Sequence, residues 1–446
     1  MNTPICDFVK KYAAAQHSRL HMPGHKGKGF LGVEHLDITE VEGADVLYNA
    51  KGIIKESMEN ASSLFSTART LYSTEGSSLS IRAMLYLLKL YSAENNRKPV
   101  ILAGRNAHKA FLSGVALNDI EVDWIYPDES EGLLSLNLTP EKLKSYLENY
   151  KEKPVALYIT SPDYLGNITD IKGLSAVCKE QGLLLLIDNA HGAYLNFLPE
   201  NQHPIALGAD ICCDSAHKTL PVLTGGGYLH ISKSAPEIFK THCESAMSLF
   251  ASTSPSYLIL ESLDSANKYM AEGYKEKLSF FVEEVEDLKK ALKAKGYTLF
   301  GNEALKITIS SKEYGYTGNE LTSILSENGI ICEFADSDFL TLMFTPENSN
   351  SDLNKLKGVL LAVNKRPEIS TPSPKVNKLR RALSIKEALF SPNTEIHAKD
   401  AEGKILASYT VSCPPAVPIA ICGEVIDENA LKAFAYYKIE KIRVIK

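Results

Sequence analysis

The sequence has no long apolar run, no secretion signal pattern and no excess of positive charge. No uninterrupted apolar stretch approaches the roughly 20 residues that a membrane helix needs. The first residues, MNTPICDFVKKYAAAQH, show no basic region followed by an apolar core. The formal net charge is −6. We therefore expect no membrane segment and no nucleic-acid partner.

Paired cysteine motifs are also missing. None of the eight cysteines falls in a C-x-x-C pair, and most stand in apolar surroundings. Buried free thiols of this kind are typical of a reducing compartment, so we expect a cytoplasmic protein. The cysteines are Cys6, Cys178, Cys212, Cys213, Cys243, Cys332, Cys413 and Cys422.

Several motifs for other chemistries are absent. PGHKGKG (23–29) lacks the spacing of a P-loop, and no G-x-S-x-G is present. His21 and His25 are four residues apart, but Pro23 and Gly24 between them argue against a helical metal pair. We predict no metal site.

Short apolar runs alternate with helical patterns over the first 270 residues. The runs at 99–104, 154–160, 183–188 and 209–215 are continuously apolar, which predicts strands covered on both faces. Helical patterns lie between them, for example at 78–93, 140–150 and 173–182. This alternation predicts an α/β fold with a large, mostly parallel sheet.

The texture changes after about residue 270. A long polar helix is expected at 274–296, followed by short strands and a helix at 353–364, then a proline-containing linker at 366–375. We predict four segments: an N-terminal arm (1–35), a large cofactor-binding domain (36–270), a small α/β domain (271–367) and a C-terminal domain (368–446).

Polar residues cluster where the predicted strands end. Asp188 ends one strand, and Ser215, His217 and Lys218 follow the next. In an open parallel sheet, ligands bind beyond the carboxyl ends of the strands, so these groups are expected to converge. Two further clusters fit the same edge: Gly76, Ser77 and Ser78 open a helix, and His108 follows another strand.

Each cluster suits one part of pyridoxal phosphate. Lys218 could bind the cofactor aldehyde, and Asp188 could pair with the pyridine nitrogen. Gly76, Ser77, Ser78 and Ser215 could hold the phosphate at a helix N-terminus, and His108 could stack on the ring. Taken singly, each residue is more often a cap, a turn residue or a surface lysine. The four clusters in this order favour the cofactor.

The same residues carry a resemblance to the ornithine/lysine/arginine decarboxylases, in the short bacterial form without the N-terminal receiver-like domain. It covers nearly the whole chain. The matching segments are RLHMPGHKG (19–27), DITEVEGADVL (37–47), GIIKESMENASSLF (52–65), STEGSSLSIRAML (73–85), GRNAHKAF (104–111), SPDYLGNITDI (161–171), DNAHGAY (188–194), DSAHKTLPVLTGG (214–226), STSPSYLILESLD (252–264) and CPPAVPIAICGE (413–424).

The resemblance implies an aspartate aminotransferase-like fold, called fold type I, and a role for each matching residue. Lys218, His108 and His217 would be catalytic. The residues implied to bind the cofactor are Gly76, Ser77, Ser78, His108, Asp188, His191, Ser215, His217, Lys218, Thr253 and Ser254, the last two reaching the partner subunit's phosphate in a homodimer whose active site lies at the interface. Glu424 would meet the distal cation of the substrate.

The expected reaction is decarboxylation of a basic amino acid to its amine, in polyamine metabolism. Arginine is favoured over lysine and ornithine by analogy with the short bacterial members. Glu424 or Asp45 could serve any of the three head groups. Two alternatives stay open: another pyridoxal-phosphate reaction such as transamination, or a non-catalytic cofactor-binding regulatory protein.

Overall fold

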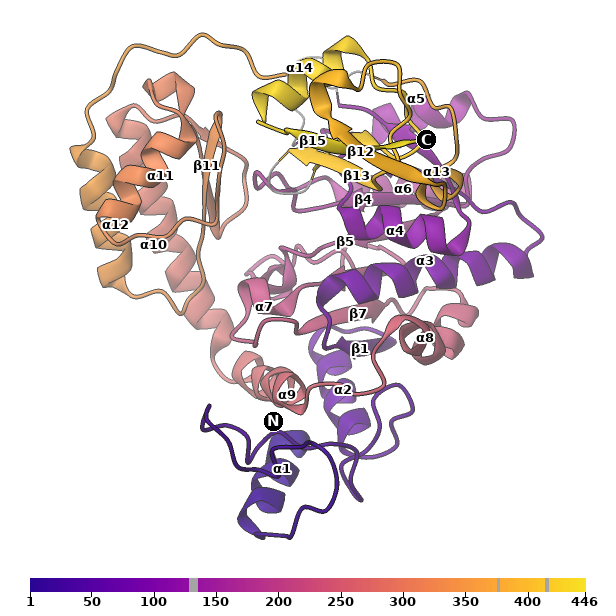
Figure 1. Ribbon diagram of the computed structural model, residues 1–446. Coiled ribbons are helices and arrows are strands. Elements are labelled where there is room, and N and C mark those ends of the chain that lie inside the picture. Colours follow the sequence, from indigo (N-terminus) through magenta and orange to yellow (C-terminus); the bar gives the residue numbers. More distant parts are fainter. Residues whose placement is uncertain (128–134, 375–377, 414–416) are drawn as a thin grey trace. The chain divides into compact units, whose positions relative to one another are not determined.

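The computed structural model describes residues 1–127, 135–374, 378–413 and 417–446 (Figure 1). The chain forms two compact units. The first unit contains Met1–Pro99, Val155–Leu157 and Ile171–Lys277, and the second contains Val100–Pro154, Tyr158–Asp170 and Leu278–Lys446. The boundary of 270 and the other predicted segment limits stay predictions. None of the described helices combines the length and apolarity that a bilayer crossing requires.

The first unit holds four strands and most of the helices around them. The strands are β1 (Arg69–Ser73), β5 (Leu184–Asp188), β6 (Ile211–Asp214) and β7 (Gly227–Ile231). The helices are α1 (Pro4–Ala14), α2 (Ile53–Leu64), α3 (Gly76–Glu94), α6 (Ile171–Gln181), η1 (Ala193–Phe197), α7 (Ala216–Thr219), α8 (Glu237–Phe250) and α9 (Tyr257–Ala271).

The main sheet has seven strands in the order β1-β7-β6-β5-β4-β2-β3. Its strands β2 (Val100–Gly104) and β4 (Ala156–Thr160) lie within the apolar runs predicted at 99–104 and 154–160, whereas β3 (Glu121–Ile125) was not predicted. β5 pairs with β6 in parallel, and β2 pairs with β3 in parallel. β7 is antiparallel to both β6 and β1. Every residue of β5, β6 and β7 is buried, as expected for strands covered on both faces.

The second unit contains the remaining helices of the sheet region and a small four-stranded sheet. α4 (Lys109–Asn118) and α5 (Pro140–Glu148) accompany β2 and β3, and α10 (Tyr274–Lys295) leads to the small sheet of order β10-β11-β9-β8. Its elements are β8 (Leu299–Phe300), β9 (Lys306–Ser310), η2 (Lys312–Tyr314), α11 (Gly318–Glu327), β10 (Phe334–Ala335), β11 (Phe339–Met343) and α12 (Asn350–Ala362). Among the short strands expected after residue 296, the segment GIICEFAD (329–336) forms a strand only at its two residues Phe334–Ala335.

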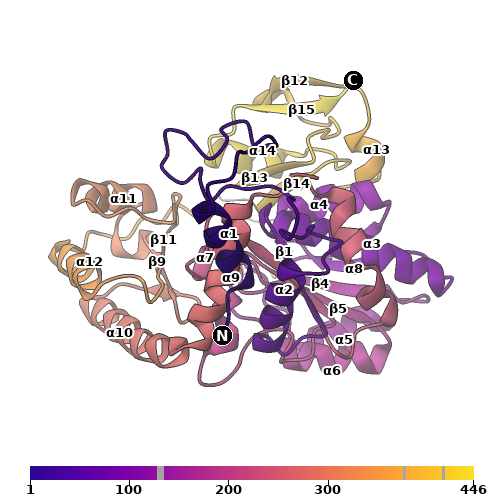
Figure 2. The ribbon, with the colours of Figure 1, turned by 90° about the horizontal axis from the view of Figure 1, so that it is seen from below.

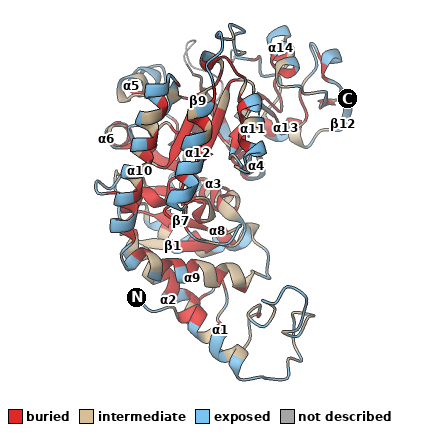
Figure 3. Cartoon of the chain, turned by 90° about the vertical axis from the view of Figure 1, so that its left-hand side faces the viewer, coloured by how far each residue is buried: buried red, intermediate tan, exposed pale blue. Residues whose placement is uncertain are grey.

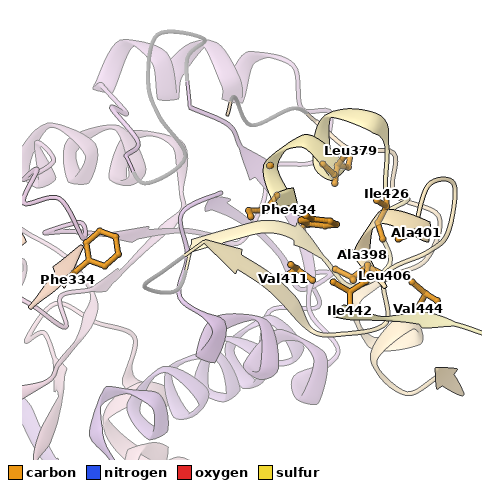
Figure 4. Packing of buried hydrophobic residues seen from close by; sticks show 14 of the residues in the cluster. Phe334, Leu379, Ala398, Ala401, Leu406, Val411, Ile426, Phe434, Ile442 and Val444 are labelled. Atoms are coloured by element: carbon orange, nitrogen blue, oxygen red, sulfur yellow. The ribbon is translucent and has the colours of Figure 1, made fainter. Parts of the chain in front are cut away.

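The C-terminal part of the second unit has its own apolar core. Leu406, Val411, Phe434, Ile442 and Val444 belong to one cluster of buried residues (Figure 4). The elements are α13 (Ile385–Leu389), β12 (Asn393–His397), η3 (Ala398–Asp400), β13 (Thr410–Cys413), β14 (Val417–Ile421), α14 (Glu428–Tyr436) and β15 (Lys441–Ile445). Residues 414–416 of the proline-rich motif lie outside the described residues.

The N-terminal segment is anchored at one end and exposed along the rest. α1 packs against α2 and α9, as the view from below shows (Figure 2). The Asp264 carboxylate of α9 accepts hydrogen bonds from the backbone N–H groups of Ile5 and Cys6, both at 3.0 Å. From residue 11 to residue 37 no residue is buried (Figure 3). Leu20 and Leu31 are 94% and 83% exposed.

Candidate active site

Lys218 lies in the short helix α7, directly after the buried strand β6. Its Nζ lies 2.9 Å from Nε2 of His191, which follows β5. Because β5 and β6 are parallel neighbours, their carboxyl ends bring these two segments together. The structure thus places an amine beside an imidazole at the sheet edge where the sequence predicts a ligand site.

A second pair of site residues meets at the start of α3. The Ser215 hydroxyl donates a hydrogen bond to the Ser77 hydroxyl at 2.8 Å, and both residues are buried. Ser78 follows in the first turn and is half-buried. The N-terminus of this 19-residue helix also presents backbone N–H groups without helical partners. Hydroxyls and N–H groups together are donors that suit a phosphate.

Glycines allow the backbone segments around this helix start to approach closely. Gly76 has φ +66°, a left-handed conformation that favours glycine, and its N–H bonds to the Gly225 carbonyl at 2.6 Å. A Cβ on Gly227 would lie 2.8 Å from the Asp214 carbonyl oxygen. The glycine run after Lys218 therefore brings the backbone against β6 and α3. A Cβ on Gly76 itself would meet only His217 Cε1, at 3.7 Å.

Asp188 is the last residue of β5 and is buried. Its Oδ1 accepts a hydrogen bond from the Ala190 N–H at 3.2 Å, and the Cys213 thiol donates to the same oxygen at 3.6 Å. Burial, followed by the nearby Asp188 charge, raises the pKa of Cys213 well above its ordinary value. That thiol therefore stays protonated and serves as a donor rather than a nucleophile.

His217 is half-buried and bonded to the glycine-rich segment. Its Nδ1 lies 2.9 Å from the Gly226 carbonyl, so Nδ1 carries the proton and donates. Burial lowers the pKa of His217, the Gly226 hydrogen bond opposes this, and the Lys218 charge lowers it further. The neutral ring with a bare Nε2 is therefore favoured near neutral pH.

His108 belongs to the second unit and is the N-cap of α4. Its Nδ1 accepts a hydrogen bond from the Ala110 N–H at 3.2 Å, which fixes the imidazole at the helix start. The ring is half-buried. Its predicted stacking on the cofactor stays a prediction.

Glu424 is buried in the second unit and paired with Arg105. Arg105 Nη2 lies 3.0 Å from Glu424 Oε2, and the side chains are only 1% and 6% exposed. The Ile421 N–H donates to the same oxygen at 2.8 Å. Trp124 and Tyr126 place their rings 5.5 and 5.8 Å from the guanidinium. The Glu424 carboxylate, which the sequence predicts to bind the distal cation of the substrate, is thus already paired with the Arg105 guanidinium.

Asp45 has a structural task in the first unit. Its carboxylate accepts backbone hydrogen bonds from Val46, Lys51, Gly52, Ile54 and Lys55, at 2.8 to 3.3 Å. These bonds cap the start of α2. Burial opposes the effect, but the bonds from Lys51 and Gly52 lower the pKa of Asp45 below its ordinary value. Its role as a substrate ligand stays a prediction.

Thr253 and Ser254 lie in the exposed connection between α8 and α9. The Ser254 N–H donates to the Ser252 hydroxyl at 3.1 Å, and the Ser252 N–H donates to the Glu75 carboxylate at 2.8 Å. The connection is therefore tied to the residue before α3. Both side chains are exposed in the single chain, and their contact with the phosphate of the partner subunit stays a prediction.

Comparison with known proteins identifies the family. The model of the Orn/Lys/Arg decarboxylase major domain matches residues 3–311, more than half of the chain. The chain belongs to the Orn/Lys/Arg decarboxylase family. It is 28% identical to the arginine decarboxylase of Bacillus subtilis, over 96% of this chain and 92% of that protein. It is equally similar to the uncharacterized protein YaaO of the same organism, over 97% and 93%.

Solved structures share the fold of this decarboxylase at low sequence identity. The lysine decarboxylase of Francisella novicida superposes with a TM-score of 0.78 at 16% identity, over 100% of this chain and 81% of that one. The constitutive lysine decarboxylase of E. coli gives 0.77 at 17% identity, over 100% and 82%. The fold is therefore that of fold type I enzymes, as the sequence predicts.

This family member is a pyridoxal-phosphate-dependent amino-acid decarboxylase. The residues of the first unit fit the cofactor. Ser77 and Ser215 offer hydroxyl donors at a long helix N-terminus, Asp188 offers a buried carboxylate, and Lys218 offers an amine next to His191. Gly76 opens the helix in a left-handed conformation that favours glycine.

Three residues of the decarboxylase site region were missed by sequence reasoning. Arg105 lies inside the matched motif GRNAHKAF, but nothing in its spacing points to Glu424, 319 residues later. His203 and His230 contact Asp214, which stands directly before Ser215. A histidine in a buried strand such as GYLHI (227–231) was the available signal, because a buried polar group needs a partner.

Proposed function

We propose that arginine is the preferred substrate of this basic amino-acid decarboxylase and that the product amine enters polyamine formation. The relatives named arginine decarboxylase in Bacillus subtilis and Bacillus anthracis, at 28% and 26% identity over almost the whole chain, support arginine. The observation that carries the chemistry is the Lys218 amine, 2.9 Å from His191, at the sheet edge where Asp188 ends β5.

Pyridoxal phosphate, when bound, supplies an electron sink for the charge left by the departing carboxyl group. In our proposal Lys218 Nζ binds the cofactor, and His191 Nε2 orients that amine. Asp188 holds the proton on the pyridine nitrogen, since a buried carboxylate stabilises a nearby cation. His108 covers the ring face.

The phosphate is assigned to the start of α3. Ser77 and Ser215 donate through their hydroxyls, and Ser78 contributes its backbone N–H. Gly76, whose own N–H bonds to the Gly225 carbonyl, forms the turn that opens the helix beside the phosphate. His217 lies beside Gly76 and closes this side of the site. Thr253 and Ser254 are proposed to reach the phosphate of the partner subunit.

The proton returned to the substrate α-carbon is proposed to come from Lys218. The competing donor, His217, has a lowered pKa and donates its Nδ1 proton to the Gly226 carbonyl. A ring that is neutral with a bare Nε2 is a poor acid near neutral pH. Lys218 would donate the proton from Nζ, which is the atom whose place on the cofactor the substrate amine takes.

The distal cation of the substrate is assigned to Glu424 before Asp45. Asp45 accepts hydrogen bonds from five backbone N–H groups. Among the described residues, the donors to Glu424 are Arg105 and the Ile421 N–H, and both bind its Oε2. Because the Arg105 charge already partly neutralises Glu424, this carboxylate would bind a second cation only weakly. Selectivity then depends on how a substrate head group shares the carboxylate with Arg105.

We also propose a cytoplasmic homodimer. The apolar residues Leu20, Phe30 and Leu31 are almost wholly exposed in the single chain, which a second copy would cover. The seven cysteines that the structure describes are all free thiols, as a reducing compartment favours.

The test is an absorbance spectrum of the purified protein with pyridoxal phosphate, followed by arginine, lysine and ornithine in turn, with carbon dioxide release measured. A visible band that changes with arginine while carbon dioxide is released supports the proposal. Faster release from lysine or ornithine would reassign the substrate. Lys218→Ala should abolish the band, and the control Lys233→Ala, an exposed lysine, should keep it. A band that Lys218→Ala leaves intact would refute the role of Lys218.

A further inference from the structure

Two histidines and one aspartate form a buried cluster behind the cofactor segment of the first unit. Asp214 Oδ2 lies 3.1 Å from His203 Nε2 and 3.2 Å from His230 Nε2, and all three side chains are fully buried. The other oxygen, Oδ1, accepts a hydrogen bond from Asn189 Nδ2 at 2.7 Å. The ring of Phe65 packs on His230 with a centroid distance of 4.5 Å.

The remaining ring nitrogens define the protonation of both histidines. The Ile205 N–H donates to His203 Nδ1 at 3.4 Å, so that nitrogen is bare and Nε2 carries the proton. His230 Nδ1 lies 2.9 Å from the Thr70 hydroxyl, which can donate to it in the same way. Two neutral rings then each donate Nε2–H to Asp214.

The pKa shifts of Asp214 and His230 agree with an ionised aspartate between two neutral histidines. Burial alone would raise the pKa of Asp214, but His203 and His230 lower it well below the ordinary value. Burial lowers the pKa of His230, which favours its neutral ring. The anion is thus balanced by three N–H donors, from Asn189 and the two histidines.

Asp214 stands between two residues of the cofactor site. It directly precedes Ser215, whose hydroxyl bonds to Ser77, and its partner Asn189 directly follows Asp188. The Asn189 N–H also bonds to the Cys213 carbonyl at 3.0 Å. The carboxylate therefore joins the ends of β5 and β6 just where Asp188 and Ser215 leave them.

We propose that Asp214 is a positioning residue, which His203 and His230 hold so that it sets the placement of Asp188 and Ser215 toward the cofactor. The proposal rests on the cofactor roles given to Asp188 and Ser215 above. It differs from a metal site made by the same three side chains. A metal bound at His203 Nε2 would require a bare Nε2, which the Ile205 hydrogen bond to Nδ1 opposes.

The experiment compares Asp214→Asn with Asp210→Asn in the full chain. Asp210 lies before the other end of β6, is half-buried and accepts the Leu185 N–H at 2.8 Å, so it is a matched control without a link to the site. Asn at 214 places an amide donor against three N–H donors. Pyridoxal-phosphate affinity is measured well below the unfolding temperature of each variant. Asp214→Asn should weaken this binding about tenfold or more, and Asp210→Asn should weaken it by less than about twofold.

A second pair of variants keeps the test valid if Asp214→Asn does not fold. His230→Gln retains a side-chain N–H near the position of Nε2, whereas His230→Leu has none. Retained cofactor affinity in His230→Gln and a loss in His230→Leu support the positioning role. In the unloaded wild-type protein, ¹⁵N NMR of labelled histidines at pH 7 should show His203 and His230 protonated on Nε2 only.

Three results would overturn the inference. Asp214→Asn could lose thermal stability yet bind the cofactor as tightly as the wild type, which would make the cluster purely structural. The NMR spectrum could show the proton on Nδ1. One equivalent of a metal could accompany the wild type and be lost in Asp214→Asn. Failure to release carbon dioxide from any basic amino acid would refute the proposed substrate class alone, because the affinity comparison needs no turnover.

Discussion

Arg105 and Glu424 are buried side chains of opposite charge, and each is the main charged partner of the other. Arg105→Met should therefore lower the free energy of unfolding by about 3–5 kcal/mol, since it leaves Glu424 buried without its cation. The double variant Arg105→Met/Glu424→Gln should recover most of that loss. Urea denaturation of the four proteins in a double-mutant cycle measures the coupling.

The exposed pair Lys290–Asp287 on α10 is the control for this cycle. Lys290→Met should leave the unfolding free energy almost unchanged, because water already solvates both charges. An equal loss in Arg105→Met and Lys290→Met would contradict the assignment of a buried pair.

Glu261 gives the protein a pH-dependent loss of stability. Burial raises the pKa of this carboxyl to about 7, against the attraction of Lys10 and with further repulsion from Asp264. A carboxyl with a raised folded-state pKa binds its proton more tightly in the fold. Stability therefore falls as pH rises from the ordinary carboxyl value of 4.5 through about 7.

Glu261→Gln should remove this part of the pH dependence. We expect it to raise the unfolding free energy at pH 8 by about 1 kcal/mol, a value reduced for partial exposure, and to change little at pH 4. Thermal unfolding across that range measures the difference. A variant that is no more stable than the wild type at pH 8 would show that the ionised Glu261 is well solvated.

The limits of sequence reasoning at this scale follow from distance along the chain. Lys218, Asp188 and Ser77 were predicted because each stands at the end of a recognisable strand or the start of a helix. The partner of Glu424 was not, because burial and pairing depend on side chains brought together only by the fold. Asp45 shows the same limit, since its backbone hydrogen bonds have no signature in the sequence.

At the scale of elements, α1 is attached by a side chain from another helix. Its own N-cap, Thr3, makes no side-chain capping bond, and Asp264 of α9 binds the first N–H groups instead. Asp264→Ala should therefore release α1 and cost about 1–3 kcal/mol. Hydrogen exchange over residues 4–14 should accelerate while the strands of the main sheet stay protected.

Asp7→Asn is the matched control for the release of α1. Asp7 is exposed on the same helix, and its carboxylate accepts a hydrogen bond from the hydroxyl of the N-cap residue Thr3 at 3.1 Å. Exchange in α1 should stay near that of the wild type in this variant. Equal acceleration in both variants would mean that α1 frays through its own low stability rather than through loss of Asp264.

Most elements of the main sheet could be read from the sequence, but their directions only in part. Continuous apolar runs located β2, β4, β5 and β6, and helical spacing located α3, α5 and α6. The antiparallel strand β7 was not predicted, because its short apolar run follows the glycines that were considered only as part of the lysine motif. Strand direction depends on tertiary connections, which the periodicity of a strand does not encode.

At the scale of the whole molecule, the exposed N-terminal segment is expected to decide the oligomeric state. Light scattering should give about 98 kDa, twice the chain mass of 49.0 kDa. Leu31→Glu should shift the protein toward monomer by placing charge on an apolar contact. Phe280→Glu, on the exposed face of α10, should leave the mass unchanged. A wild-type monomer at micromolar concentration would contradict the dimer.

The span between Arg105 and Glu424 has a consequence for synthesis on the ribosome. The guanidinium leaves the exit tunnel more than three hundred residues before its carboxylate partner. The Arg105 charge therefore lacks its carboxylate partner, and the strands and helices around it cannot complete their packing, until almost the entire polypeptide has been made. A chain released early, before codon 424, lacks this compensation, so premature termination near the end should yield a protein that proteases remove rather than a slightly shortened enzyme.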